Sequence, residues 1–180
     1  MKKILIFIFS FLLPSITASA AELEFSLNKT KIFVGDKFSV KLTLSGFDST
    51  LGTDTIILYD PKSLNVESVI PTSLYPTYNP LKDQRIDIQK GKILLSGSAG
   101  IGKPVTADGE FATINFVAQK AGTTQVKFAY QAGSTSKTGV VSPSGKELLT
   151  SEPSTLSIYV SNPSFFQKII KWFNKVFFKK

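Results

Sequence analysis

The chain has 180 residues, with 21 lysines and arginines against 13 aspartates and glutamates, and it contains neither histidine nor cysteine. Without those two residue types it cannot form a Ser–His or Cys–His nucleophilic pair, a zinc site built on His or Cys, or a disulfide. The remaining option, a pair of carboxylates, is disfavoured because most of the acids sit in turns or at outward strand positions. We therefore predict a protein that is not an enzyme and that uses no metal or other cofactor.

The first twenty residues are typical of a secretory signal peptide. Lys2 and Lys3 precede an apolar run over residues 4–13, and Ala18-Ser19-Ala20 has the small-x-small pattern of a cleavage site. The apolar run is much shorter than the ~20 residues that a membrane-spanning helix needs. We predict residues 1–20 to be removed, and the mature protein to be exported and extracellular or at the cell surface.

The net charge of +8 belongs to the two ends of the sequence. Two lysines lie in the predicted signal peptide and five lie in the last thirteen residues. Between residues 21 and 161 there remain 14 basic and 13 acidic residues, so this part is nearly neutral. No basic surface is indicated there, and we predict no nucleic-acid partner.

Residues 21–161 are predicted to form one all-β domain. Apolar and polar residues alternate with a period of two, as in half-buried strands, over residues 23–27, 38–44, 112–118, 126–130 and 156–160. Continuous apolar runs at 55–59 and 93–95 are typical of central strands. Turns are predicted at Gly35-Asp36, Ser45-Gly46, Asp60-Pro61 and Asp108-Gly109. About nine short strands at this spacing predict a two-sheet β-sandwich.

Two stretches interrupt the strands. Residues 71–80 carry three prolines and two tyrosines, and residues 133–147 are rich in Ser, Gly and Thr. We expect both to be loops, the second a long excursion before the last strand. Two interpretations of Tyr75 and Tyr78 stay open: their rings plug one end of the sandwich, or they form a platform on which a sugar stacks.

Several fragments, in their order along the chain, are together similar to a cohesin domain. They are Val34-Gly35-Asp36 before an alternating strand, Tyr59-Asp60-Pro61 at the end of a buried one, Gly91-Lys92-Ile93-Leu94-Leu95, and Asp108-Gly109-Glu110-Phe111-Ala112-Thr113-Ile114. The resemblance covers about Leu23 to Val160. It implies a jelly-roll sandwich that presents one flat sheet face to a helical dockerin protein.

The resemblance also implies where such a partner would bind. Counting back from Tyr59-Asp60-Pro61, Asp54 occupies the position of an aspartate that hydrogen-bonds the dockerin, and Gly52 stands where the family often has asparagine. In the loop after Leu95, Ala99 and Gly100 stand where the family often has alanine followed by an acid. The scaffold therefore matches the family better than the binding residues do. Asp54 also has a simpler interpretation, as a solvated residue at the start of a strand.

Residues 162–180 form a separate, cationic tail. Asn162-Pro163 ends the last strand and Ser164 is a good helix N-cap. Six apolar residues then follow at helical spacing: Phe166, Ile169, Ile170, Phe173, Val176 and Phe177. Trp172 lies on their flank, and Lys168, Lys171 and Lys175 lie on the other face. This pattern predicts an amphipathic helix lying on an anionic membrane surface. Alternatively, the helix packs on its own domain or binds a protein partner.

Three classes of function fit the sequence. The first is an exported, non-catalytic protein-interaction module that binds a dockerin-like protein and is held at the membrane surface by its tail. The second is a carbohydrate-binding module that recognises a polysaccharide, although the only tryptophan lies in the tail. The third is a structural domain of the cell envelope.

Overall fold

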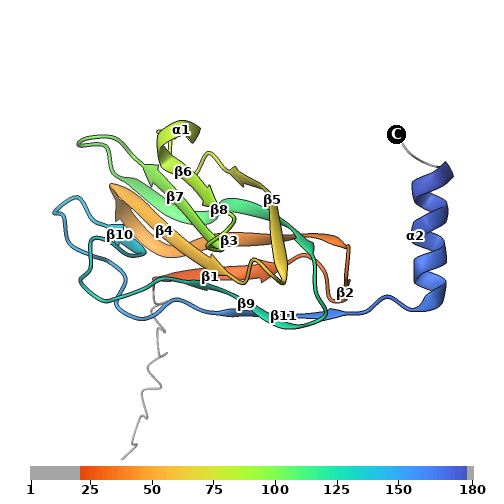
Figure 1. Ribbon diagram of the computed structural model, residues 1–180. Helices are drawn as coiled ribbons and strands as arrows, with labels where there is room; N and C mark the ends of the chain where they lie inside the picture. The colour runs from red at the N-terminus through yellow and green to blue at the C-terminus, as the bar shows by residue number, and fades with distance from the viewer. Residues whose placement is uncertain (1–20, 178–180) are drawn as a thin grey trace, which may run out of the picture.

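Residues 21–177 are described by the computed structural model; the predicted signal peptide, residues 1–20, and residues 178–180 lie outside the described part. Two sheets pack face to face (Figure 1). The strands of the first sheet, in spatial order, are β1 (Glu22–Leu27), β3 (Lys37–Thr50), β8 (Val105–Ala118) and β5 (Leu64–Pro71). The second sheet has the order β2 (Ile32–Phe33), β11 (Leu156–Ser161), β9 (Gly122–Phe128), β4 (Gly52–Tyr59), β7 (Lys92–Ser98) and β6 (Gln84–Asp87), and β10 (Gly139–Val141) pairs with β4.

The core lies between the two sheets and follows the alternation of the sequence. Every second residue of β3 from Phe38 to Leu44 is buried, and β8 contributes Ile114 and Phe116 to the same layer. Apolar side chains on one face of each strand leave water when the faces meet, which is the main stabilising term for such a domain. The predicted all-β, two-sheet sandwich followed by a C-terminal helix is confirmed.

The structure has more strands than the sequence predicted, because strands of two to four residues are too short to show an alternating pattern. Residues 21–177 contain eleven strands, of which β2, β6 and β10 have two to four residues each. Two predicted turns are also wrong: Ser45-Gly46 lies inside β3 and Asp108-Gly109 lies inside β8, where the register between these strands shifts. The glycines have φ values of 73° and 135°. Positive φ suits a β-bulge as well as a turn, so the sequence signal is the same for both.

One of the two tyrosines in the stretch 71–80, Tyr75, is buried between the two sheets. Tyr75 is 3% exposed, and its ring packs edge-on against Phe111 with centroids 5.6 Å apart. Its hydroxyl lies 2.9 Å from the Thr50 hydroxyl and 2.5 Å from the Thr53 hydroxyl. The sugar-stacking interpretation is therefore wrong for Tyr75. The stretch runs into a short helix, α1 (Pro80–Asp83), which the sequence had not indicated.

Removing the Tyr75 hydroxyl is expected to destabilise the domain by about 1–2 kcal/mol, because Thr53 is then left buried without its partner. Thr50 loses less, since it can still donate to the carbonyl of Val105. Urea denaturation of Tyr75→Phe, compared with Tyr159→Phe at an exposed position, measures this difference. Equal stability of the two variants would contradict the importance of the buried hydroxyl cluster.

The stretch 133–147 is more ordered than the predicted long excursion. Its residues Gly139–Val141 form β10, which pairs with Gly52–Asp54 of β4. The Glu147 carboxylate fixes this segment by accepting hydrogen bonds from the backbone N–H groups of Val140 and Leu149, both at 2.9 Å. A strand of three residues carries too little alternation to be recognised in a sequence.

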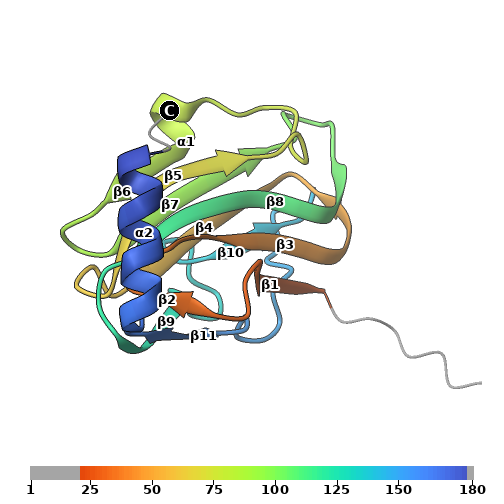
Figure 2. The same ribbon diagram turned by 90° about the vertical axis from the view of Figure 1, so that its right-hand side faces the viewer.

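The C-terminal helix, α2 (Phe165–Phe177), stands off one end of the sandwich, beyond β2 and the end of β11 (Figure 1). Figure 2 looks from that side and shows α2 in front of the strands. Only Asn162, Pro163 and Ser164 separate it from β11. Strand β1 begins at the opposite end of the sandwich (Figure 1).

Candidate partner-binding face

The solvent side of β4, β7 and β6, which we name the outer face, carries the first group of predicted site residues. Residues directly opposite each other in neighbouring strands share a face. Asp54 lies opposite Ser96, and Ile56 lies opposite Leu94, which in turn lies opposite Arg85 of β6. Asp54 and Arg85 are exposed, whereas Leu94 and Ser96 are partly buried. The outer face thus combines a carboxylate, a hydroxyl, a guanidinium and aliphatic surface.

Asp54 occupies the centre of the hollows on this face. Three of them, with volumes of about 330, 220 and 290 Å³, all have Asp54 in their lining. Within the described residues, no side chain or N–H group donates a hydrogen bond to its carboxylate, and no lysine or arginine forms an ion pair with it. All the acceptor positions of this carboxylate are therefore open to a partner.

One edge of the outer face is covered by the chain between β9 and β10. The Thr138 hydroxyl accepts from the N–H of Ile56 at 2.9 Å and lies 3.3 Å from the Ile56 carbonyl, to which it can donate. As a result, Ile56 is buried although it points to the solvent side. Thr135, Ser136 and Lys137 form the wall of the 290 Å³ hollow next to Asp54. This wall limits the shape of any partner that approaches from the β10 side.

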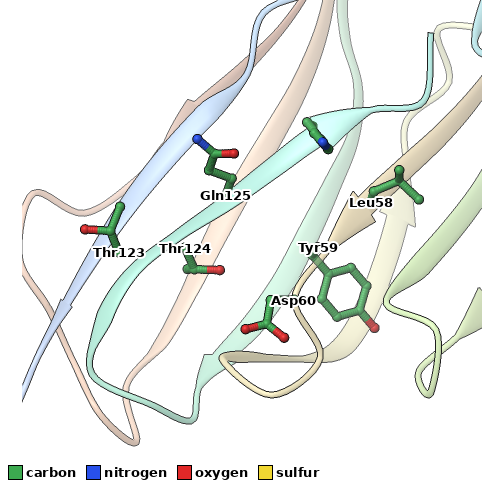
Figure 3. A pocket seen from close by; sticks show the side chains of 7 residues that line it. Leu58, Tyr59, Asp60, Thr123, Thr124 and Gln125 are labelled. Atoms are coloured by element: carbon green, nitrogen blue, oxygen red, sulfur yellow. The ribbon is translucent and has the colours of Figure 1, made fainter.

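The other end of β4 forms a shallow pocket of about 470 Å³ against β9 (Figure 3). Its lining includes Leu58, Asp60, Gln125 and Lys127. The Asp60 carboxylate accepts from the Ser63 hydroxyl at 2.6 Å and from the Lys62 N–H at 3.0 Å, and these hydrogen bonds lower its pKa. Asp60 therefore stabilises its own turn. Tyr59 is buried in the core, and this burial raises the pKa of its hydroxyl.

The four predicted partner-binding residues do not all reach the outer face. Gly52 is partly exposed on β4, opposite Ser98, and a Cβ built there would lie 2.9 Å from the Gly97 carbonyl oxygen. Gly100 is partly exposed in the loop after β7, with φ of 86°. Ala99, by contrast, is 3% exposed and belongs to the core, so its side chain cannot contact a partner without rearrangement.

The sequence reasoning missed the residues that surround Asp54. Leu94 and Ser96 alternate with the buried Ile93 and Leu95, so the period of two within β7 could have placed them outward. Arg85 was missed because β6 has only four residues. Thr138 offered no signal, since its role depends on a pairing 82 residues away in sequence.

The predicted membrane-binding residues lie on α2, and most of their side chains are accessible. Phe166 and Ile170 are 76% and 58% exposed, and Lys168, Trp172, Val176 and Phe177 are also exposed, whereas Ile169 is partly buried. The backbone of Lys171, Phe173 and Lys175 is helical, but their side chains lie outside the described part of the structure. Among the described residues, no helix has both the length and the hydropathy needed to cross a membrane.

Comparisons with known proteins agree on one family. The family model described as "Cohesin domain" matches residues 23–146. A cohesin from a Clostridium thermocellum type I cohesin–dockerin complex is 18% identical, with a TM-score of 0.60, and the match covers 79% of this chain and 100% of that one. A type II cohesin domain from the Acetivibrio cellulolyticus cellulosome is also 18% identical, with a TM-score of 0.58 and coverage of 81% and 94%.

A third structure, the cohesin module of a Clostridium perfringens family 33 glycoside hydrolase, is 12% identical, with a TM-score of 0.57 and coverage of 80% and 98%. The comparison with curated protein sequences gave no match. At these identities the solved structures establish the fold, and the family model, which spans well over half of the sequence, confirms the predicted resemblance. The chain belongs to the cohesin domain family.

Proposed function

We propose that this protein is an exported, non-catalytic receptor module that binds a dockerin-like protein through the outer face of β4, β7 and β6. The observation that carries the proposal is Asp54: an exposed carboxylate at the junction of three hollows, without a hydrogen-bond donor or a cation from the described residues. A related cohesin from Clostridium thermocellum is described in complex with a dockerin.

The chemistry of the outer face suits a helical partner. Asp54 accepts hydrogen bonds from hydroxyl, amide or cationic donors. Counted from Asp54 along the strands, Leu94 belongs to the next outward cross-strand pair and Leu58 to the one after it, and both offer aliphatic contact. Arg85 supplies a cation at the β6 edge. A helix that carries a donor near Asp54, an apolar residue over Leu94 and an acid near Arg85 satisfies all three.

The tail supports the second part of the proposal, attachment to an anionic membrane surface. The exposed aromatic and aliphatic residues of α2 supply apolar area, and five lysines with no acid follow Ser164. Such a helix lies in the plane of the lipid headgroups, with its apolar face toward the acyl chains. In this arrangement the predicted export signal brings the domain across the membrane and the tail keeps it there.

Isothermal titration of residues 21–161 with dockerin domains from cellulosome-forming bacteria tests the receptor function. We expect at least one dockerin to bind with 1:1 stoichiometry, and cello-oligosaccharides, used as the control ligand, to give no heat. The control addresses the polysaccharide alternative, which loses its aromatic platform because Tyr75 is in the core. Saccharide binding without dockerin binding would contradict the proposal.

A further inference from the structure

A groove on the β2–β11 side of the sandwich is distinct from the outer face around Asp54. It has a volume of about 770 Å³ and is lined by residues of β11 and of the segment from Leu27 to Phe33. Tyr159 stands in it with 70% of its surface exposed, which is unusual for a large side chain on a strand of this domain. Phe33 also lines the groove and pairs with Ser161, two residues after Tyr159 on β11.

The groove is cationic at its rim. Lys29 and Lys31 belong to its lining and are exposed, and no carboxylate is among the residues that line it. The Lys29 ammonium donates one hydrogen bond to the Lys37 carbonyl, which leaves two of its three N–H donors for a ligand. The Asp36 carboxylate is close in sequence, but it accepts a hydrogen bond from the N–H of Phe33 within its own turn. An exposed tyrosine in a groove that also contains a phenylalanine and two lysines is a combination typical of the membrane–water interface, where ring and ammonium groups meet lipid headgroups.

The groove lies at the end of the domain from which the tail emerges. Ser161 lines the groove and is also the last residue of β11, and α2 begins at Phe165. Four residues span at most ~14 Å at 3.3–3.6 Å per residue. Figures 1 and 2 both place β2 at this end. A membrane that binds the first turn of α2 therefore lies within about one or two Debye lengths of Lys29 and Lys31. At that distance the two lysines are still attracted to anionic headgroups.

We propose that this groove is a second membrane contact, which takes anionic phospholipid headgroups between Lys29, Lys31 and Tyr159 and fixes the orientation of the sandwich above the bilayer. This inference rests on the proposed attachment by α2. With the β2–β11 end on the lipid, the opposite end, which carries β10 and the 129–138 segment, points away from it (Figure 1). The lipid thus leaves the Asp54 end of the outer face accessible to a partner.

The sequence contains no cysteine, so a single introduced cysteine is the only thiol that a maleimide-type label can modify. Full-length mature protein with Thr30→Cys at the groove, or with Ser136→Cys at the opposite end, is labelled with a polarity-sensitive fluorophore and mixed with phosphatidylcholine vesicles with or without phosphatidylglycerol. Thr30 and Ser136 are both exposed. Trp172, the single tryptophan, reports separately on α2.

On anionic vesicles we expect a blue shift of the probe at residue 30 and none at residue 136, together with a blue shift of Trp172. The double variant Lys29→Ser/Lys31→Ser should lose the shift at residue 30 and weaken vesicle binding by about tenfold, while Trp172 still inserts. The matched control, Lys103→Ser/Lys146→Ser, removes the same charge from exposed positions outside the groove, one between β7 and β8 and one after β10, and should bind like the parent.

Three results would overturn the inference. If Trp172 shifts but the probe at residue 30 does not, the tail binds lipid and the groove does not. If the probe at residue 30 is already in an apolar environment without vesicles, and truncation after Ser161 exposes it, the groove holds α2 instead of lipid. If neither reporter responds to vesicles, the attachment by α2 fails as well, and the groove proposal falls with it.

Discussion

Replacing Phe166 and Ile170 of α2 with aspartate is expected to release the mature protein from anionic vesicles, with a loss of membrane partitioning of at least about 100-fold. Both side chains are more than half exposed and available to lipid. Burial of each contributes about 1.5–3 kcal/mol, and every 1.4 kcal/mol is a factor of ten in the partition coefficient. Vesicle flotation of the variant and the parent measures the difference.

The matched control for this prediction is Ile101→Asp, which makes the same chemical change at a fully exposed loop residue between β7 and β8. It should float like the parent. High salt should weaken the parent's binding only in part, because salt screens the lysines and leaves the apolar contribution. If the protein truncated after Ser161 floats as well as the intact one, α2 is not the anchor, and its packing on the domain or on another protein becomes the better account.

Asp54→Ala is expected to weaken binding of a dockerin-like partner by about 1.5–3 kcal/mol, roughly 10- to 150-fold, because it removes a charge-assisted hydrogen bond. The substitution should leave the stability of the domain almost unchanged, since Asp54 is exposed and no described residue donates to it. Calorimetric titration gives the affinity, and circular dichroism verifies the fold.

Two further variants separate the causes of the Asp54 effect. Asp54→Asn keeps the shape and removes the charge, so an intermediate loss would assign part of the effect to charge. Asp48→Ala removes an exposed carboxylate from β3, in the other sheet, and should not change the affinity. Unchanged affinity of Asp54→Ala for a partner that the parent binds would mean that Asp54 is only a solvated residue on β4, or that another face binds.

The fold class and the family follow from patterns that are local in the sequence. Alternation with a period of two in segments such as 38–44 fixes which side chains are buried, because successive residues of a strand point to opposite faces. The absence of histidine and cysteine limits the chemistry of the chain in the same way, because no folding can supply a missing residue type. The amphipathic pattern of residues 166–177 was equally readable, since helical spacing is also a local property.

Features that depend on contacts between distant residues came from the packing of the two sheets. Asp54 was predicted from its place before Tyr59, but Thr138, which covers the adjacent Ile56, and Arg85 at the β6 edge of the outer face come from segments whose pairing carries no local signal. The glycines at 46 and 109 looked like turns and proved to be bulges, because a positive φ has the same sequence preference in both. Tyr75 was assigned to the core by packing alone, since a tyrosine in a loop suits both a buried hydroxyl cluster and an exposed platform. The alternation of residues 156–160 places Tyr159 outward, but the groove next to it exists only because β2 pairs with β11.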